Sequence, residues 1–203
     1  TVMAAFAFSR IKFPGREVIF TLFLATMMIP GEMMVITNYI TVTKTAKNVA
    51  KTLFGIKNFT GVNSYWALIV PFLISVYYIY LLRQNFKQIP DELYYAAKVD
   101  GTSDFKYLIK IMIPIAMPTI ITITILKLMG SWNAYVWPEM ITRKQEMKLI
   151  SNGLRTSFSD SSGRTNQGYQ MAAAFAVTMP LLIAFIFLRK YLMRGVSRSG
   201  IKG

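Results

Sequence analysis

The sequence contains neither cysteine nor histidine. Disulfide bonds, thiol catalysis and imidazole general bases are therefore excluded, together with the commonest protein ligands of zinc. The phosphate-binding motif G-x-x-x-x-G-K-[ST] is also missing, since the stretch from Gly153 to Gly163 is merely polar. We expect no catalytic residues, no metal site, no cofactor in this chain and no ATP hydrolysis by these 203 residues.

Charged residues are scarce as well. They make up 16% of the chain and apolar residues 54%, against roughly 25% and 45–50% in typical soluble proteins. The net charge of +14 raises the question of a nucleic acid partner, but the basic residues are scattered between apolar blocks rather than gathered on one face with aromatic residues. Membrane-flanking charge explains this pattern better, and no nucleic acid partner is expected.

Four apolar blocks are candidates for membrane spans, at about residues 17–40, 64–82, 115–137 and 171–188. A helix rising about 1.5 Å per residue needs about 20 residues to cross a hydrocarbon core of about 30 Å. Residues 1–8 are expected to be the last turns of an earlier span. The sequence thus predicts an all-α fold, a polytopic transmembrane helical bundle forming one domain over residues 1–203.

One stretch between these blocks is both charged and strongly patterned. Pro90, Asp91 and Glu92 predict a helix start, and Asp100-Gly101 predicts its end, because glycine readily adopts the left-handed conformation of a helix C-cap. A second helix is expected to begin at Thr102 or Ser103. Its apolar face would comprise Phe105, Leu108, Ile109 and Met112.

The same stretch carries a family pattern. Ala96-Ala97, Asp100-Gly101 and Ile111-x-Ile113-Pro114 resemble the E-A-A…G…I-x-L-P cytoplasmic loop of ABC importer permeases. The resemblance to the carbohydrate branch, of the multiple-sugar and maltose type, covers nearly the whole chain. Further matching motifs are Arg10-x-x-Phe13-Pro14-Gly15-Arg16, Leu82-Arg83-Gln84, Trp132-Asn133-x-Tyr135-x-Trp137-Pro138 and Gly195 to Gly203.

What the resemblance implies is a coupling loop at about residues 83–113 that docks into a cleft of a separate ATPase. Tyr95 stands where the family has glutamate and Ile113 where it has leucine, which puts any single ion pair with the ATPase in doubt. The alternative is an ordinary helical hairpin linking two spans. The implied docking residues are Glu92, Tyr94, Tyr95, Ala96, Ala97, Asp100 and Gly101.

The resemblance also implies the surroundings of the chain. It would form half of the translocation pathway of an ATP-driven oligosaccharide importer in a bacterial or archaeal plasma membrane. Its partners would be a homologous second permease, two ATPase subunits that bind ATP and Mg, and an extracytoplasmic sugar-binding protein. With the loop in the cytoplasm, thirteen basic residues lie on that side and nine on the other, a weak positive-inside bias.

Polar residues inside the expected spans are candidates for lining the pathway, because such groups are costly unless they face protein or water. Glu32 and Lys127 lie deep enough to pair across the bundle. Alternatively, Glu32 lies at the outer interface and Lys127 faces a wet cavity. A cluster of Trp132, Asn133, Tyr135 and Trp137 suits a carbohydrate, since aromatic rings stack on sugars and an amide forms hydrogen bonds with hydroxyls. An interfacial aromatic belt is the alternative.

Other functions remain open at this point. In an ion-coupled secondary transporter, Glu32 would carry protons, and uptake would depend on a proton gradient rather than on ATP. A scaffold or sensor without transport would bind an ATPase but move no solute. Related importers also carry glycerol phosphates, so the sequence leaves the solute itself open.

Overall fold

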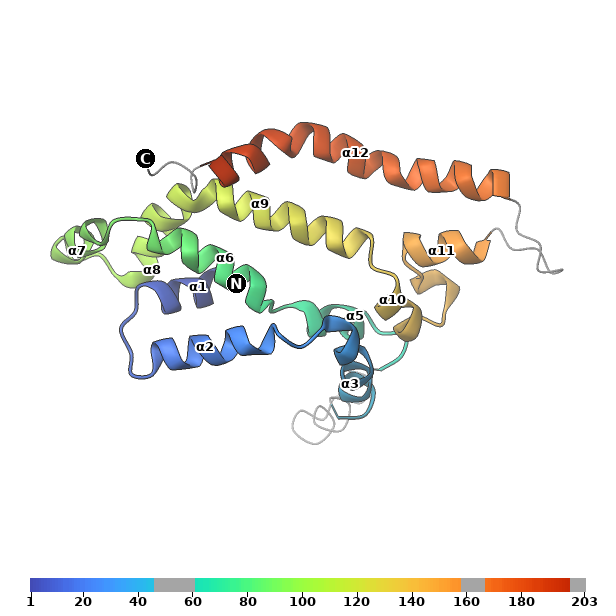
Figure 1. The fold of residues 1–203 in the computed structure, drawn as a ribbon, viewed down its shortest axis with the longest axis horizontal. Helices are drawn as coiled ribbons and strands as arrows, with labels where there is room; N and C mark the ends of the chain where they lie inside the picture. Colours follow the sequence, from blue (N-terminus) through green and yellow to red (C-terminus); the bar gives the residue numbers. More distant parts are fainter. Residues whose placement is uncertain (46–60, 158–166, 198–203) are drawn as a thin grey trace. The chain divides into compact units, whose positions relative to one another are not determined.

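The computed structural model describes residues 1–45, 61–157 and 167–197 (Figure 1). Every element in those ranges is helical, which confirms the all-α fold class. The chain divides into two compact units. Unit 1 comprises Thr1–Ile29, Ile74–Leu126 and Leu188–Gly203, and unit 2 comprises Pro30–Leu73 and Lys127–Phe187. The end of the expected C-terminal motif, residues 198–203, lies outside the described residues.

Unit 1 contains the patterned stretch. Its helices are α1 (Val2–Ser9), α2 (Arg16–Thr26), α6 (Val76–Lys87), α7 (Asp91–Val99), α8 (Asp104–Tyr107), the π-helical η4 (Leu108–Met112) and most of α9 (Ile113–Trp132). α1 packs against α6 and α2, and α7 and α8 form a hairpin that joins α6 to α9 (Figure 1). The last turns of α6 therefore belong to the region expected to be the start of a loop.

An aromatic and aliphatic core holds unit 1 together. Phe6 and Phe8 of α1 pack with Phe20 of α2 and with Ile79 and Leu82 of α6. Where these helices cross a membrane, close packing rather than removal from water holds them together, because lipid is as apolar as the core. The same core extends to Ala97 of α7 and to Tyr107, Leu108 and Met112 before α9. The connecting hairpin is therefore anchored on the same core as α1, α2 and α6.

Unit 2 is built from shorter helices. They are η1 (Gly31–Met33), α3 (Met34–Ile40), η2 (Thr41–Thr45), α5 (Tyr65–Ile69), η3 (Val70–Phe72), α10 (Val136–Ile141), η5 (Gln145–Met147), α11 (Ile150–Ser157) and most of α12 (Gln167–Ser197). Its small core consists of Val42, Ala67, Trp137 and Ile141. The indole N–H of Trp137 donates to the carbonyl of Ala67 at 3.1 Å, so this buried aromatic residue is a packing residue.

Two stretches of the described chain, Asp104–Trp132 and Gln167–Phe187, are long and apolar enough to cross a membrane. The number of candidate spans rises to four if two bent pairs of helices are each counted as one span. These pairs are Arg16–Thr26 with Gly31–Lys44 and Tyr65–Phe72 with Val76–Lys87. The first block, expected at 17–40, comprises α2, η1 and α3 and is interrupted at Pro30-Gly31, as a proline followed by a glycine predicts. Proline lacks the N–H that would continue the helix.

The third block also differs from its expected bounds. α9 ends at Trp132 and α10 begins at Val136, so the expected helix over 115–137 is interrupted. Pro138 explains the break, because its ring would clash with the carbonyl of Ala134 in a continuous helix. In the first turn of α10 the same proline is tolerated. Trp132, Asn133 and Tyr135 consequently flank a turn rather than share one helix face.

Candidate functional site

The α7–α8 hairpin has the ends that its sequence predicts. α7 begins directly after Pro90, with Asp91 and Glu92 in its first turn, where carboxylates are favoured by the helix dipole. Gly101 has a φ of +70°, the left-handed conformation that glycine adopts without strain. The N–H of Thr102 donates to the carbonyl of Ala97 at 2.9 Å, which closes the helix end.

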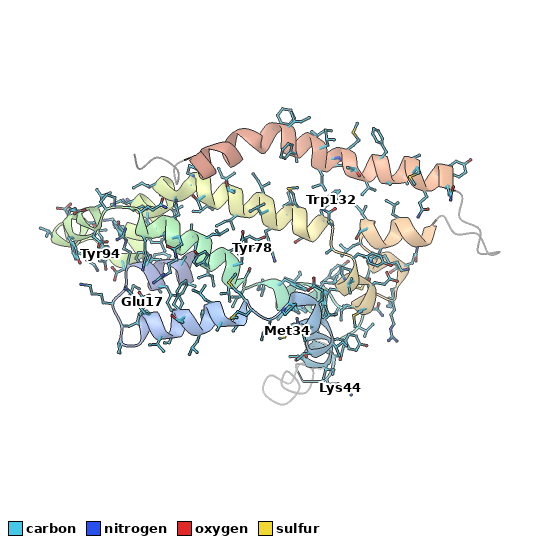
Figure 2. All side chains as sticks on the ribbon, viewed as in Figure 1. Glu17, Met34, Lys44, Tyr78, Tyr94 and Trp132 are labelled. Carbon is cyan, nitrogen blue, oxygen red and sulfur yellow. The ribbon has the colours of Figure 1, made fainter. Side chains whose placement is uncertain are left out.

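The inner side of the hairpin is braced by Tyr94. Its ring lies 5.1 Å from that of the buried Tyr107 in an edge-on arrangement, and its hydroxyl donates to Asp104 at 2.6 Å. Lys98 forms an ion pair with the same carboxylate at 2.7 Å. Burial and the hydrogen bond to Asp104 raise the pKa of Tyr94 to about 12. Figure 2 labels Tyr94 on this hairpin. Tyr94 and Ala97 thus face their own unit and support the hairpin.

The outer side of the hairpin exposes apolar side chains. Val99 is 88% exposed and Phe105 60%, and Leu93 and Tyr95 are exposed as well. Among the expected docking residues, those that are exposed to solvent are Glu92, Tyr95, Ala96, Asp100 and Gly101. Apolar residues of this size, set among charged ones, mark a surface that another protein can cover.

The expected apolar face of the second helix is only half right. Ser103 caps it, accepting from the N–H of Lys106 at 3.4 Å, but Phe105 and Ile109 are exposed. The buried side chains are Tyr107, Leu108 and Met112. The π-helical turn over Leu108–Met112 is the physical reason, because its wider turns shift the register from the α-helical spacing assumed from sequence.

Two buried arginines were not predicted as functional residues. Arg10 bonds the carbonyls of Phe86 and Ile89 and forms an ion pair with Asp91. Arg83 bonds the carbonyl of Phe8 at 3.0 Å. Both arginines lie inside family motifs, and this position is the one indication that the sequence offers of their importance. Their place next to apolar blocks otherwise indicates only charged residues beside a membrane span.

Glu32 and Lys127 both belong to unit 2. Glu32 is exposed in η1, and the ammonium of Lys127 lies 5.7 Å from the centre of the Phe72 ring, a cation–π contact. Their pairing stays a prediction. Among the residues that the structure describes, no group of three or more His, Cys, Asp or Glu side chains could hold a metal ion.

The aromatic cluster after α9 is tied to its own backbone. The Asn133 amide donates to the carbonyl of Met129 at 3.0 Å, and Asn152 donates to the carbonyl of Tyr135 at 3.0 Å. The indole N–H of Trp132, labelled in Figure 2, is buried without a hydrogen-bond partner. The three expected pathway residues do lie together in unit 2, but part of their polar chemistry closes the turn.

Residues 1–198 match the protein family described as binding-protein-dependent transport system inner membrane component. Two curated relatives are the arabinooligosaccharide transport system permease protein AraQ of Bacillus subtilis, 29% identical over 201 residues, and the sn-glycerol-3-phosphate transport system permease protein UgpE of Yersinia pestis, 27% identical over 199 residues. These alignments cover 99% and 98% of this chain.

In both cases the chain spans 66% of the length of the relative. The fold is also similar to that of a bacterial ABC transporter involved in the import of the acidic polysaccharide alginate. The TM-score is 0.67 at 22% identity, over 94% of this chain and 66% of that one. The match over residues 1–198 confirms the family expected from the motifs: this chain belongs to the binding-protein-dependent transport system inner membrane components.

Proposed function

We propose that this chain is part of the permease subunit of an ATP-driven carbohydrate importer, and that the α7–α8 hairpin is its docking surface for a separate ATPase. The observation that carries the proposal is the two-sided build of the hairpin. Its inner side is anchored by Tyr94 and Ala97 on the core of unit 1, and its outer side presents Val99 and Phe105 to solvent.

A protein partner explains this outer side better than lipid does. The apolar side chains alternate with the charged residues Glu92, Lys98, Asp100 and Lys106, which are costly to place in a hydrocarbon core. Apolar anchors surrounded by charged residues are typical of protein interfaces, in which a polar rim encloses a few buried contacts. The surface therefore suits a cleft in a soluble subunit at the membrane face.

Movement, not chemistry, would be the task of this hairpin. Closure of two ATP-bound ATPase subunits would displace α7 as a rigid body and tilt the attached spans between inward-facing and outward-facing states. ATP and Mg would be held by the ATPase. A homologous second permease would complete the pathway, and an extracytoplasmic sugar-binding protein would deliver the solute.

An oligosaccharide is the solute we propose. The relatives include permeases named for arabinooligosaccharides and for polygalacturonan and rhamnogalacturonan, and the Trp132–Tyr135 segment offers aromatic rings and an amide suited to sugars. Glycerol 3-phosphate is the competing solute, since UgpE is named for it. Uptake of each labelled solute by the same reconstituted complex separates the two.

Cysteine cross-linking tests the docking surface directly, because these 203 residues contain no native cysteine. Val99→Cys in the complete permease, labelled with a thiol-reactive benzophenone maleimide, should form cross-links to the ATPase on illumination, because the benzophenone inserts into a nearby C–H bond and needs no second thiol. Tyr94→Cys, on the inner side of the same hairpin, is the matched control and should react little. Equal cross-linking at both positions, or none from Val99→Cys in an assembled complex, would contradict the assignment.

A further inference from the structure

Two buried arginines of unit 1 connect four helix ends. Arg10 follows α1 directly, and its Nη2 donates to the carbonyl of Phe86 at 2.9 Å, in the last turn of α6, and to the carbonyl of Ile89. Its Nη1 forms an ion pair with Asp91, the first residue of α7. One side chain thus joins the end of α1 to the end of α6 and to the start of the docking helix.

Arg83 makes the reciprocal connection. It lies on α6, and its Nε donates to the carbonyl of Phe8 at 3.0 Å, in the last turn of α1. Its Nη2 donates to both oxygens of Glu17 at 2.8 and 2.6 Å, at the start of α2. The guanidinium also lies 3.9 Å from the centre of the Phe20 ring.

Each arginine therefore binds the carboxyl end of the other arginine's helix. Helix ends of this kind carry unpaired carbonyls and partial negative charge, which a cation stabilises. Each arginine also binds a carboxylate in the first turn of the helix that comes after that carboxyl end in the chain. Arg10 binds Asp91 of α7, which follows α6, and Arg83 binds Glu17 of α2, which follows α1. We call Arg10, Arg83, Asp91 and Glu17 the arginine clamp. Only a planar fork with several N–H groups can hold such divergent acceptors together.

The burial of Arg10 indicates a purpose other than stability. Its side chain is 4% exposed, and its Nε is buried without a hydrogen-bond partner. Asp91, its ion-pair partner, is 66% exposed, and an ion pair that is open to water on one side contributes little to stability. In α7, Ala97 is buried and Tyr94 packs partly buried against the core of unit 1, so two side chains hold the inner side of the docking helix on its unit. The Arg10–Asp91 pair adds a contact at the start of α7, directed at α1 and α6.

We propose that Arg10 is a positioning residue that transmits a displacement of α7 to α1 and α6, so that these helices move as one body. The proposal rests on the docking function given above. Without Arg10, the ATPase would still bind the outer side of α7, but part of the displacement would be lost as motion of α7 relative to α6. ATP would then be hydrolysed with less solute moved.

The test measures solute imported per ATP hydrolysed by the complete permease, assembled with its partner permease, ATPase and binding protein in proteoliposomes. Arg10→Gln should lower this ratio by about two- to thirtyfold, the range of coupling changes seen for residues that link distant sites. ATPase association should be unchanged. An unchanged ratio in an assembled Arg10→Gln complex would overturn the proposal.

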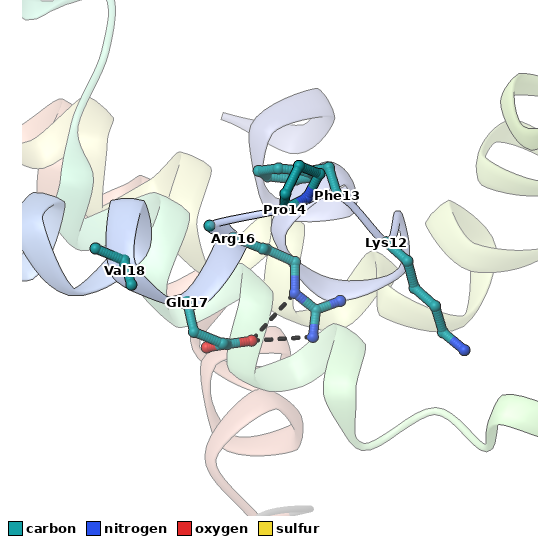
Figure 3. A pocket seen from close by; sticks show the side chains of 7 residues that line it. Lys12, Phe13, Pro14, Arg16, Glu17 and Val18 are labelled. Atoms are coloured by element: carbon teal, nitrogen blue, oxygen red, sulfur yellow. Dashed lines mark hydrogen bonds and ion pairs between the residues drawn. The ribbon is translucent and has the colours of Figure 1, made fainter.

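Arg16→Gln is the matched control. Arg16 is the first residue of α2, at the other end of the loop that begins at Arg10, and it binds Glu17 at 3.0–3.1 Å (Figure 3). The substitution therefore removes the same charge beside the clamp. None of its hydrogen bonds or ion pairs given by the structure reaches α6 or α7. The import ratio should stay within about twofold of the unsubstituted complex, the low end of the coupling range.

Asp91→Asn tests the link to the docking helix even where Arg10→Gln does not assemble, because it leaves both carbonyl bonds of Arg10 in place. Its ratio should fall less than that of Arg10→Gln, and the double variant should be no lower than Arg10→Gln alone. Additive losses would overturn the Arg10–Asp91 link. An unsubstituted complex that binds no ATPase would instead remove the proposed function, so the two failures are distinguishable.

Discussion

The α7–α8 hairpin and the turn between α9 and α10 both contain polar side chains, yet they use these groups differently. In the hairpin, Tyr94, Lys98 and Asp104 bind one another, while Val99 and Phe105 remain exposed. At the turn, Asn133 binds the carbonyl of Met129 in α9, and Asn152 of α11 binds the carbonyl of Tyr135. The hairpin is built to present a surface, whereas the turn is built to close on itself.

This contrast separates what each region can contribute to transport. Val99 and Phe105 of the hairpin are 88% and 60% exposed. The amide of Asn133 already has a backbone acceptor, so only part of its hydrogen-bonding capacity is open to a solute. In the proposed function, docking depends on apolar surface, and contact with sugar at the turn uses the aromatic rings and the remaining groups of the Asn133 amide.

The largest effect is expected at Val99. Val99→Glu places a carboxylate at the centre of the proposed interface, and truncations or charges at such anchors cost about 2 kcal/mol or more. ATPase association, measured by co-purification, should fall by at least about tenfold, and uptake with it. Val99→Ile keeps the apolar surface and should retain both. Normal association of Val99→Glu would show that the hairpin is not the docking surface.

Asn63 joins two segments of unit 2 by hydrogen bonds, and its substitution tests what these bonds contribute. Its side-chain oxygen accepts from the N–H groups of Arg143 and Lys144 at 2.6 and 2.9 Å, and its φ is +61°. Asn63→Ala removes the acceptor and adds strain, so the free energy of unfolding should fall by about 2 kcal/mol.

Asn63→Asp keeps the acceptor, and thermal unfolding of the purified permease in detergent should distinguish the two variants. ATPase association should be unaffected in both, because the residue lies outside unit 1. Loss of association in Asn63→Ala at a temperature where the variant is folded would contradict the separation of roles.

A smaller effect is expected at Tyr94. Tyr94→Phe keeps the ring against Tyr107 but loses the hydrogen bond to Asp104, worth about 1 kcal/mol. Asp104 retains Lys98, so the hairpin should remain folded. The variant should lower thermal stability slightly and leave cross-linking from Val99→Cys in place. A complete loss of cross-linking would mean that this single hydrogen bond sets the hairpin.

The same residue gives a pH dependence with a definite sign. The pKa of Tyr94 is raised from 10.0 to about 12 in the folded protein, so the folded state holds its proton where the unfolded state loses it. The associated stability is present below about pH 10 and is lost as the pH rises toward about 12. The free energy of unfolding, measured between about pH 10 and about pH 12, should decline less steeply for Tyr94→Phe than for the unsubstituted protein.

The smallest effect is expected at Asn133. Asn133→Ala removes a donor to the carbonyl of Met129 and one amide from the proposed path, so uptake should fall by about two- to fivefold with ATPase association unchanged. Asn133→Gln tests whether an amide at this position is sufficient. Uptake equal to that of the unsubstituted protein would remove Asn133 from the path.

The ends of the hairpin could be predicted because local rules decide them. Pro90, the first-turn carboxylates, Gly101 and the Ser103 cap each act within a few residues, and the structure has all of them. The buried face of the second helix could not be predicted, since the π-helical turn over Leu108–Met112 shifts the register in a way that helical spacing does not contain.

The contacts of the arginine clamp could not be predicted from the sequence, for a different reason. The hydrogen bonds from Arg10 to Phe86 and from Arg83 to Phe8 join residues 76 and 75 positions apart, and no local pattern encodes such pairs. Both arginines lie in family motifs, but their positions beside apolar blocks indicate only charges that flank a membrane span. The break after Trp132 can be predicted from Pro138, because proline interrupts a continuing helix. The family motif that contains Pro138 does not by itself indicate this break.

In the proposed function, a partner's ATP hydrolysis, delivered through α7, drives transport. This is tested by uptake of a labelled oligosaccharide by the reconstituted complex, with ATP supplied and the proton gradient collapsed. Uptake should require ATP, persist without the gradient and be abolished by Val99→Glu. Uptake that follows the gradient in the absence of ATP would contradict it and favour a proton-coupled transporter.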